Sequence, residues 1–194
     1  MTAKRKIISN YELTIEEFLA FTETRPKEER WQLIKGEPVL SPSPVDYHQI
    51  VVTNIAAVLW NTKIANNASW FVLTGTGTKS PASVRSLLQP DVMVKQLPPT
   101  GSAVSADCLV AFEILSRSNP KADQAWRRKF YSDVPNCAHY VTVSLKARHV
   151  ALHSRDANWV AQNVRAASDH VALAAIEATL TLADIYQYTL HAVR

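Results

Sequence analysis

The stretch from Cys108 to Tyr131, CLVAFEILSRSNPKADQAWRRKFY, constrains this chain more than any other. It opens with a run that is apolar apart from one carboxylate, Glu113. An ionised carboxylate buried without a partner costs several kcal/mol, so a cation, a metal ion or a proton must lie beside it. One interpretation is structural, a core glutamate ion-paired to an arginine. The functional interpretation requires a second carboxylate nearby.

Asp91 supplies a second carboxylate at the start of the apolar segment PDVMV. If Asp91 and Glu113 lie on adjacent strands, their charges repel unless a hard cation holds them, and oxygen ligands favour Mg²⁺ or Mn²⁺. The Ile114 carbonyl could add a third ligand. Such an ion can activate water and neutralise charge on a phosphate, so this arrangement predicts phosphodiester cleavage.

Basic side chains follow Glu113 closely, and they suit a polyanionic substrate such as DNA. The candidate phosphate-binding residues are Arg117, Lys121 and Arg128. The net charge of +4 and the pI of about 9.1 point the same way without demonstrating such a partner. With four glycines and no GxGxxG or GxxxxGKS motif, the sequence argues against a nucleotide cofactor.

Periodicity and capping residues predict a mixed α/β fold (α+β), with one sheet and flanking helices. Thr14 and Glu17 form a capping box, Asp46 can cap the second helix, and Thr181 with Asp184 begins the last. The predicted segments are a helix ending before Pro26, a hairpin over 30–40, a helix from Asp46, strands at 69–74, 90–94 and 108–115, a helix capped by Asn119, strands at 139–144 and 148–153, and a helix from Thr181.

The chain of 194 residues is expected to form one domain, with residues 1–11 as a lead-in and the core over about 12–190. No apolar run of about 18 residues and no signal peptide is present, so we expect a cytoplasmic protein without a membrane partner. Cys108 and Cys137 form no CxxC motif, and the six histidines form no HExxH motif. These patterns argue against a zinc hydrolase.

Several short motifs together resemble a known family. Pro90 and Asp91, followed by a strand bearing EILS, resemble the PD-(D/E)XK nuclease superfamily. More narrowly, the pattern is similar to the Uma family of restriction endonucleases. The motifs that carry this resemblance occur in family order over about 14–185: RWQLIKGE with Glu37, His48, PDV with Asp91, EILSRS from Glu113, Asp123 with Tyr131, and VPNCAHY at 134–140.

The resemblance implies a restriction-endonuclease-like mixed sheet, Asp91 and Glu113 as metal ligands, a DNA substrate and a homodimer. It also implies a lysine that positions or deprotonates water. Leu115 stands where that lysine is expected in the motif, and Arg127 stands at its alternative place on the following helix, four residues after Asp123. Arginine stays protonated, so it can stabilise phosphate charge but cannot act as a base.

Other candidate site residues have two interpretations each. Glu37 is either a turn residue or a third acidic ligand with a catalytic role, and His48 is either a surface or capping residue or a supporting catalytic one. Ser116 either caps the turn or supports the site. Asp123 either stabilises its helix by pairing with Arg127 or supports the site, and Tyr131 is either a packing residue or a supporting one.

Three functions follow from these patterns. The first is a Mg²⁺-dependent DNA endonuclease. The second is a protein of the same fold that binds nucleic acid or a protein partner without cleavage, because the base has been lost. The third is a metal-dependent hydrolase acting on another phosphate ester.

Overall fold

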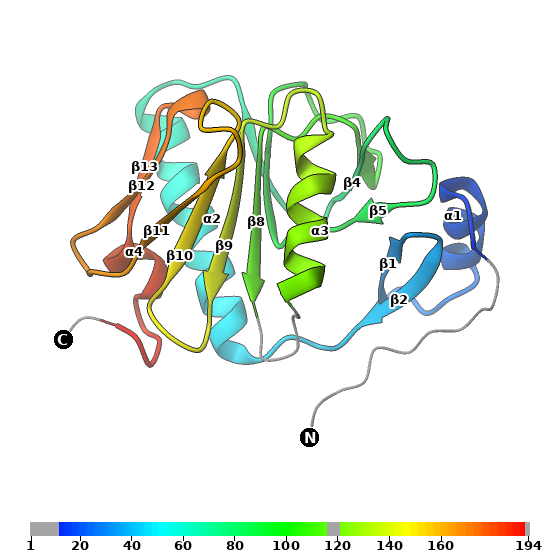
Figure 1. Cartoon of the computed structure of the whole chain (residues 1–194), viewed down its shortest axis with the longest axis horizontal. Coiled ribbons are helices and arrows are strands. Elements are labelled where there is room, and N and C mark those ends of the chain that lie inside the picture. Colours follow the sequence, from blue (N-terminus) through cyan, green and yellow to red (C-terminus); the bar gives the residue numbers. More distant parts are fainter. Residues whose placement is uncertain (1–11, 116–120, 193–194) are drawn as a thin grey trace.

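A six-stranded mixed sheet lies between helices in the computed structural model, which describes residues 12–115 and 121–192 (Figure 1). The helices of the described residues are α1 (Ile15–Glu23), α2 (Asp46–Ala65), α3 (Lys121–Ser132), the 3-10 helix η1 (Ala174–Ile176) and α4 (Leu182–Tyr186). In spatial order, the strands of the large sheet are β11 (Ala161–Val164), β10 (Val150–Ser154), β9 (His139–Ser144), β8 (Val110–Leu115), β6 (Val92–Lys95) and β3 (Phe71–Thr74).

Two smaller sheets complete the described fold. One has, in spatial order, β2 (Glu37–Ser41), β1 (Arg30–Ile34), β5 (Leu87–Leu88), β4 (Gly77–Lys79) and β7 (Val104–Ser105). The other pairs β12 (His170–Leu173) with β13 (Ala178–Thr181). In Figure 1 the five-stranded sheet lies on the α1 side of α3.

The pairing at the centre of the large sheet decides which residues can meet. Strands β6 and β8 are antiparallel, with Val92 opposite Phe112 and Met93 opposite Ala111. Strands β8 and β9 are parallel, so the chain needs a crossover to connect them, and α3 provides it. The start of β6 and the end of β8 therefore lie at one edge of the sheet, next to the helix that follows β8.

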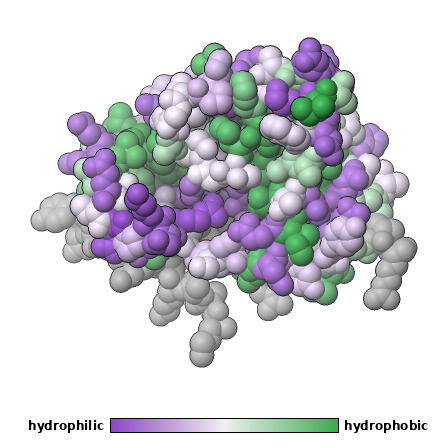
Figure 2. Space-filling model, turned by 180° about the vertical axis from the view of Figure 1, so that it is seen from behind, coloured by the Kyte–Doolittle hydropathy of each residue, from purple (hydrophilic) through white to green (hydrophobic). Residues whose placement is uncertain are grey.

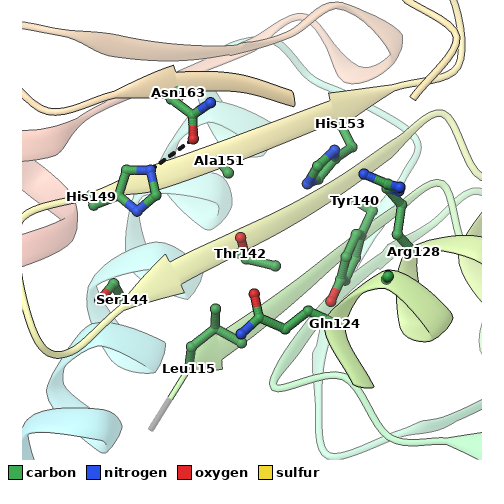
Figure 3. A pocket seen from close by; sticks show the side chains of 11 residues that line it. Leu115, Gln124, Arg128, Tyr140, Thr142, Ser144, His149, Ala151, His153 and Asn163 are labelled. Carbon is green, nitrogen blue, oxygen red and sulfur yellow. Dashed lines mark hydrogen bonds between the residues drawn. The ribbon is translucent and has the colours of Figure 1, made fainter. Parts of the chain in front are cut away.

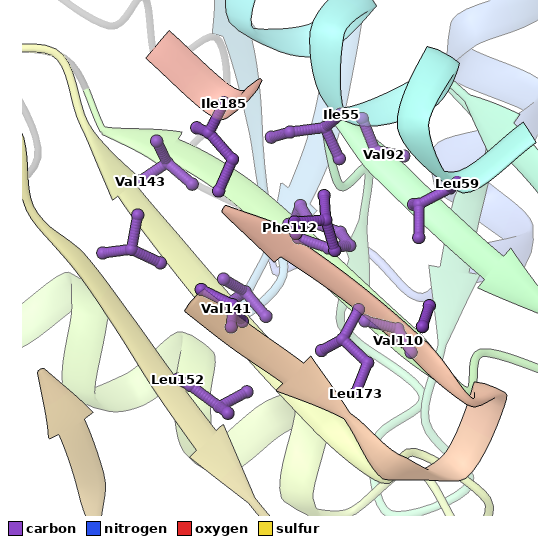
Figure 4. Packing of buried hydrophobic residues seen from close by; sticks show 14 of the residues in the cluster. Ile55, Leu59, Val92, Val110, Phe112, Val141, Val143, Leu152, Leu173 and Ile185 are labelled. Carbon is purple, nitrogen blue, oxygen red and sulfur yellow. The ribbon is translucent and has the colours of Figure 1, made fainter. Parts of the chain in front are cut away.

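Alternation along the strands separates two buried layers. Val110, Phe112 and Ile114 face the layer under α2, where Ile55 and Leu59 of that helix pack onto the sheet (Figure 4). Ala111 belongs to the layer under α3, with Tyr131 and other residues of that helix. A carboxylate at position 113 shares the parity of Ala111, so it faces α3. The α2 layer is apolar, whereas the α3 layer carries the polar site.

The face that points away from the viewer in Figure 1 carries both polar and apolar side chains. Figure 2 shows apolar side chains there in separate patches among polar ones. Trp60 and Ile64 of α2 are exposed. Among the described residues, no helix is both long enough and apolar enough to cross a membrane.

The predicted mixed α/β fold is confirmed, but the prediction of one sheet is wrong. Strands β4, β5 and β7 are two or three residues long, too short to show periodicity, and they exist through pairing with partners distant in sequence. Strands β11 to β13 were also missed. The exposed, polar β11 pairs with β10 along the edge of the large sheet.

The predicted helix starts are confirmed at two of the described helices. Thr14 with Glu17 and Thr181 with Asp184 both form capping boxes. At α2, however, Val45 is the N-cap, and Asp46 is the first helical residue, where its charge favours the helix N-terminus. The predicted cap Asn119 lies outside the described residues.

Candidate nuclease site

Asp91 and Glu113 lie next to each other across β6 and β8. The register of these strands, continued by one residue, places Asp91 opposite Glu113. The Asp91 amide donates to the Phe112 carbonyl (2.9 Å), and Asp91 Oδ2 accepts from the Ile114 amide (2.8 Å). The structure therefore places the two residues side by side, Asp91 directly before β6 and Glu113 on β8, as a shared site requires. We call Asp91 and Glu113 the carboxylate pair.

Glu113 is buried and held by two side chains of α3. Its Oε1 accepts from Arg127 Nη1 (2.8 Å) and from the Tyr131 hydroxyl (2.9 Å). Burial raises the pKa of Glu113; Arg127 opposes this rise, and the neighbouring charge of Asp91 adds to it. The ion pair that the structural interpretation requires is present. This ion pair is compatible with the functional interpretation too, because the second carboxylate, Asp91, lies next to Glu113.

One face of α3 presents three polar residues to the pair, as their four-residue spacing predicts. Asp123 Oδ2 accepts from Arg127 Nε (3.3 Å), and Tyr131 lies one turn beyond. Burial opposes the charge of Arg127, but the surrounding anionic groups, led by Glu113, outweigh it and raise the arginine pKa. Arg127 therefore stays positively charged, although only 2% of its side chain is exposed.

His48 lies against Asp91 from the first turn of α2. Its Nε2 is 3.3 Å from Asp91 Oδ1. Its Nδ1 is buried, and it has no hydrogen-bond partner among the described residues. The structure thus places His48 beside the carboxylate pair, where the supporting interpretation expects it, and this contact fixes the orientation of Asp91.

The hairpin of β1 and β2 contributes a residue that the sequence did not indicate. Gln32 Oε1 accepts from Arg127 Nη1 (3.3 Å), and Gln32 Nε2 donates to Ser41 Oγ (3.1 Å). Glu37 is exposed at the start of β2, beside the hairpin turn, and within the described residues it makes no hydrogen bond or ion pair with the carboxylate pair. A signal for Gln32 existed: it is the polar residue between Trp31 and Leu33, so it faces away from their core.

The remaining candidates lie around the start of α3. Ser116 and Arg117 are outside the described residues, and Lys121 begins α3 with a side chain that is not described. Arg128 lines a separate cavity, considered below. Lys129 faces away from the pair, as the helical period predicts, and it forms an ion pair with Asp133.

The donor set of the site fits a hard divalent ion. Arg127 forms ion pairs with Glu113 and Asp123, and Asp91 adds a third carboxylate next to Glu113. The Ile114 amide points at Asp91; since the amide and carbonyl of a strand residue point to the same side, its carbonyl oxygen is directed there too. Within residues 12–115 and 121–192, no three histidine, cysteine, aspartate or glutamate side chains group closely enough to hold a metal. Any ion would therefore depend on this carbonyl and on water.

The fold and the site define the chain as a nuclease-fold protein. The structure is similar to a crystal structure titled as a "putative nuclease belonging to DUF820" from Anabaena variabilis, with a TM-score of 0.73 and 12% identity, over 90% of this chain and 97% of that one. Residues 15–183 match the Uma2 family, described as "Putative restriction endonuclease", and the chain belongs to this family. No curated protein matches the chain in sequence.

Proposed function

We propose that this protein is a divalent-metal-dependent endonuclease that hydrolyses DNA phosphodiester bonds. The observation that carries the proposal is the carboxylate pair at one edge of the sheet, with the charged Arg127 on Glu113. Membership of the Uma2 family supports a nuclease. The metal, the DNA substrate and a homodimer belong to the proposal.

Asp91, Glu113 and the Ile114 carbonyl would hold Mg²⁺ or Mn²⁺. A bound ion would supply Lewis acidity, which activates water and neutralises charge on the phosphate. Tyr131 orients Glu113 through its hydroxyl, and His48 orients Asp91. In hydrolysis the water oxygen bonds to phosphorus, an ester P–O bond breaks, and the leaving oxygen takes up a proton.

Arg127 has a defined role in this scheme. Its guanidinium can stabilise the negative charge that builds on the phosphate oxygens. It cannot accept the proton of the attacking water, because its pKa is raised above that of an ordinary arginine. The absent base is expected to make cleavage slow compared with an enzyme that has lysine at this position.

A second candidate function is binding of nucleic acid without cleavage. The observation that favours it is that Glu113 Oε1 already carries both Arg127 and Tyr131. A carboxylate held in this way is satisfied without an ion. Arg127 could thus replace both the metal charge and the lysine.

Cleavage of supercoiled plasmid DNA in Mg²⁺ or Mn²⁺ separates the two candidates. We expect slow, metal-dependent nicking by the natural protein, no nicking by Asp91→Ala, and a rate increase of about 10²-fold or more for Arg127→Lys, since general base catalysis contributes on that order. Cleavage by Arg127→Lys alone would show that the natural protein has lost catalysis, as the second candidate requires. If no variant cleaves DNA in either metal, the endonuclease proposal is wrong.

Two controls accompany this assay. Arg25→Lys makes the same exchange at an arginine that pairs with Glu29, and it should leave nicking unchanged. Calorimetric titration of Mg²⁺ and Mn²⁺ into the natural protein and into Asp91→Ala/Glu113→Ala tests the site directly. Metal binding by the natural protein and not by the double variant is the expected result.

A further inference from the structure

A cavity of about 390 Å³ opens on the α3 side of the large sheet (Figure 3). Its floor is formed by β9 and β10, and α3 forms one wall. The cross-strand partners Thr142 and Ala151 lie at the centre of the floor. These short side chains leave space between the larger Tyr140 and His153 at one end and His149 at the other. The volume lies within the range of small-ligand sites.

The strand register connects this floor to the catalytic carboxylate. Glu113 is opposite Thr142, Thr142 is opposite Ala151, and Ala151 is opposite Asn163. Adjacent strands lie about 4.8 Å apart, so the centre of the floor is on the order of 5–10 Å from Glu113. Successive nucleotides rise about 3.4 Å along a duplex strand and more when the strand is extended. A strand whose phosphate lies at the carboxylate pair therefore reaches the cavity with a neighbouring nucleotide.

The cavity offers one uncompensated positive charge. Arg128 of α3 lines it, and this guanidinium has no ion-pair partner in the part of the chain that the structure describes. Among the described residues that line the cavity, none is an aspartate or a glutamate. Figure 3 shows the side chains of Arg128 and His153 close together at one end. An anionic group fits this end, and a cationic ligand does not.

A buried hydroxyl at the cavity lacks a partner. Tyr140 is 1% exposed, and its hydroxyl makes no hydrogen bond with any described residue. Its ring stacks on Tyr131 (centroids 4.8 Å apart) and on His153 (5.8 Å). Because a buried polar group without a partner is costly, an oxygen acceptor on a ligand would satisfy this hydroxyl. The stack also joins the cavity to Tyr131, which holds Glu113.

We propose that this cavity binds the nucleotide next to the scissile phosphodiester on the cleaved strand. Arg128 contacts its phosphate, and the Tyr140 hydroxyl donates to one of its oxygen atoms. The polar side chains of Thr142 and Asn163 line the space for the sugar and base. This inference rests on the proposed nuclease function, because the cleaved strand is what brings the nucleotide to the cavity.

Titration with thymidine 5′-monophosphate, followed by amide NMR shifts, tests the cavity without any cleavage. We expect shifts at Thr142, Ala151 and Asn163, and an affinity about tenfold weaker in Arg128→Gln, since a charge-assisted contact is lost. Tyr140→Phe should weaken binding to a smaller extent. Thymidine lacks the phosphate. Its affinity for the natural protein should therefore be no higher than the affinity of the nucleotide for Arg128→Gln.

The adjacent Lys129 provides the matched control. It carries the same charge on the same helix, but it pairs with Asp133 outside this cavity. Lys129→Gln should therefore keep the nucleotide affinity within about twofold, as expected for an exposed ion pair. Equal losses in both variants would reveal non-specific attraction and overturn the proposal. Shifts confined to other parts of the protein, or no shifts, would overturn it as well.

Cleavage kinetics separate this inference from the proposed function. If the natural protein nicks DNA and Arg128→Gln leaves KM unchanged, the cavity proposal is wrong and the nuclease proposal stands. If no DNA is cleaved but the nucleotide binds in an Arg128-dependent manner, the cavity is a nucleotide site and the endonuclease proposal falls. A higher KM with little change in kcat for Arg128→Gln supports both the cavity proposal and the nuclease proposal.

Discussion

At the scale of single residues, the contact between Arg127 and Glu113 organises the site. Both side chains are buried, and the guanidinium also touches Asp123 and Gln32. A buried ion pair contributes little net stability by itself, because desolvation opposes the attraction. Removing only one member is different, since an uncompensated charge then remains in the core.

Arg127→Met should therefore destabilise the protein by about 3–5 kcal/mol at neutral pH, because Glu113 loses its buried cation. Urea unfolding followed by circular dichroism measures the change. Replacing both members, as in Glu113→Met/Arg127→Met, should recover most of the loss. A cost below about 1 kcal/mol for the single variant would contradict an ionised pair at this position.

At the scale of elements, α4 holds the turn between β9 and β10. The Tyr186 hydroxyl lies 2.9 Å from the carbonyls of Ser144 and His149, and it accepts from the His149 amide (3.1 Å). Burial raises the pKa of Tyr186 to about 12. A five-residue helix with little intrinsic stability thus fixes the end of β9 and β10, the strands that form the floor of the cavity.

Tyr186→Phe should cost about 1–3 kcal/mol, because the amide and carbonyl groups of the turn lose a buried partner. The matched control is Tyr188→Phe, two residues further on, where 75% of the side chain is exposed. That change should stay within about 0.5 kcal/mol. Urea unfolding of both variants measures the difference, and equal effects would show that the hydroxyl does not hold the turn.

At the scale of the whole molecule, the buried His139 links the large sheet to the segment at η1. His139 of β9 contacts Ser154 Oγ through Nδ1 (2.9 Å), and its Nε2 accepts from the Ala175 amide (3.3 Å). The second contact ties β9 to η1 and requires an unprotonated Nε2. Burial lowers the pKa of His139 below its ordinary value.

The pH dependence of stability follows from this lowered pKa. The unfolded chain takes up a proton on His139 near its ordinary pKa of about 6.5, while the folded chain does so only at lower pH. Stability should therefore be complete above that value and fall as the pH drops below it. In His139→Gln, urea midpoints from pH 8 to 5 should fall less than in the natural protein, and parallel curves would contradict this prediction.

The sequence by itself determined that Glu113 is a buried carboxylate and which elements carry the candidate site residues. Glu113 in an apolar run had to find a buried partner, whatever the fold, because desolvation of a carboxylate is costly. The four-residue spacing of Asp123, Arg127 and Tyr131 places them on one helix face without any tertiary contact. The capping boxes at Thr14 and Thr181 were equally local, so they too could be predicted.

Tertiary structure alone decided which distant residues meet at the site. Gln32 rather than Glu37 contacts Arg127, because hairpin packing against α3 depends on the complete sheet arrangement. The short strands β4, β5 and β7 form only through pairing with distant partners. The cavity on β9 and β10 likewise depends on the register that aligns Glu113 with Thr142 and Ala151. Local patterns encode period and charge, whereas register and packing arise only when separate segments come together.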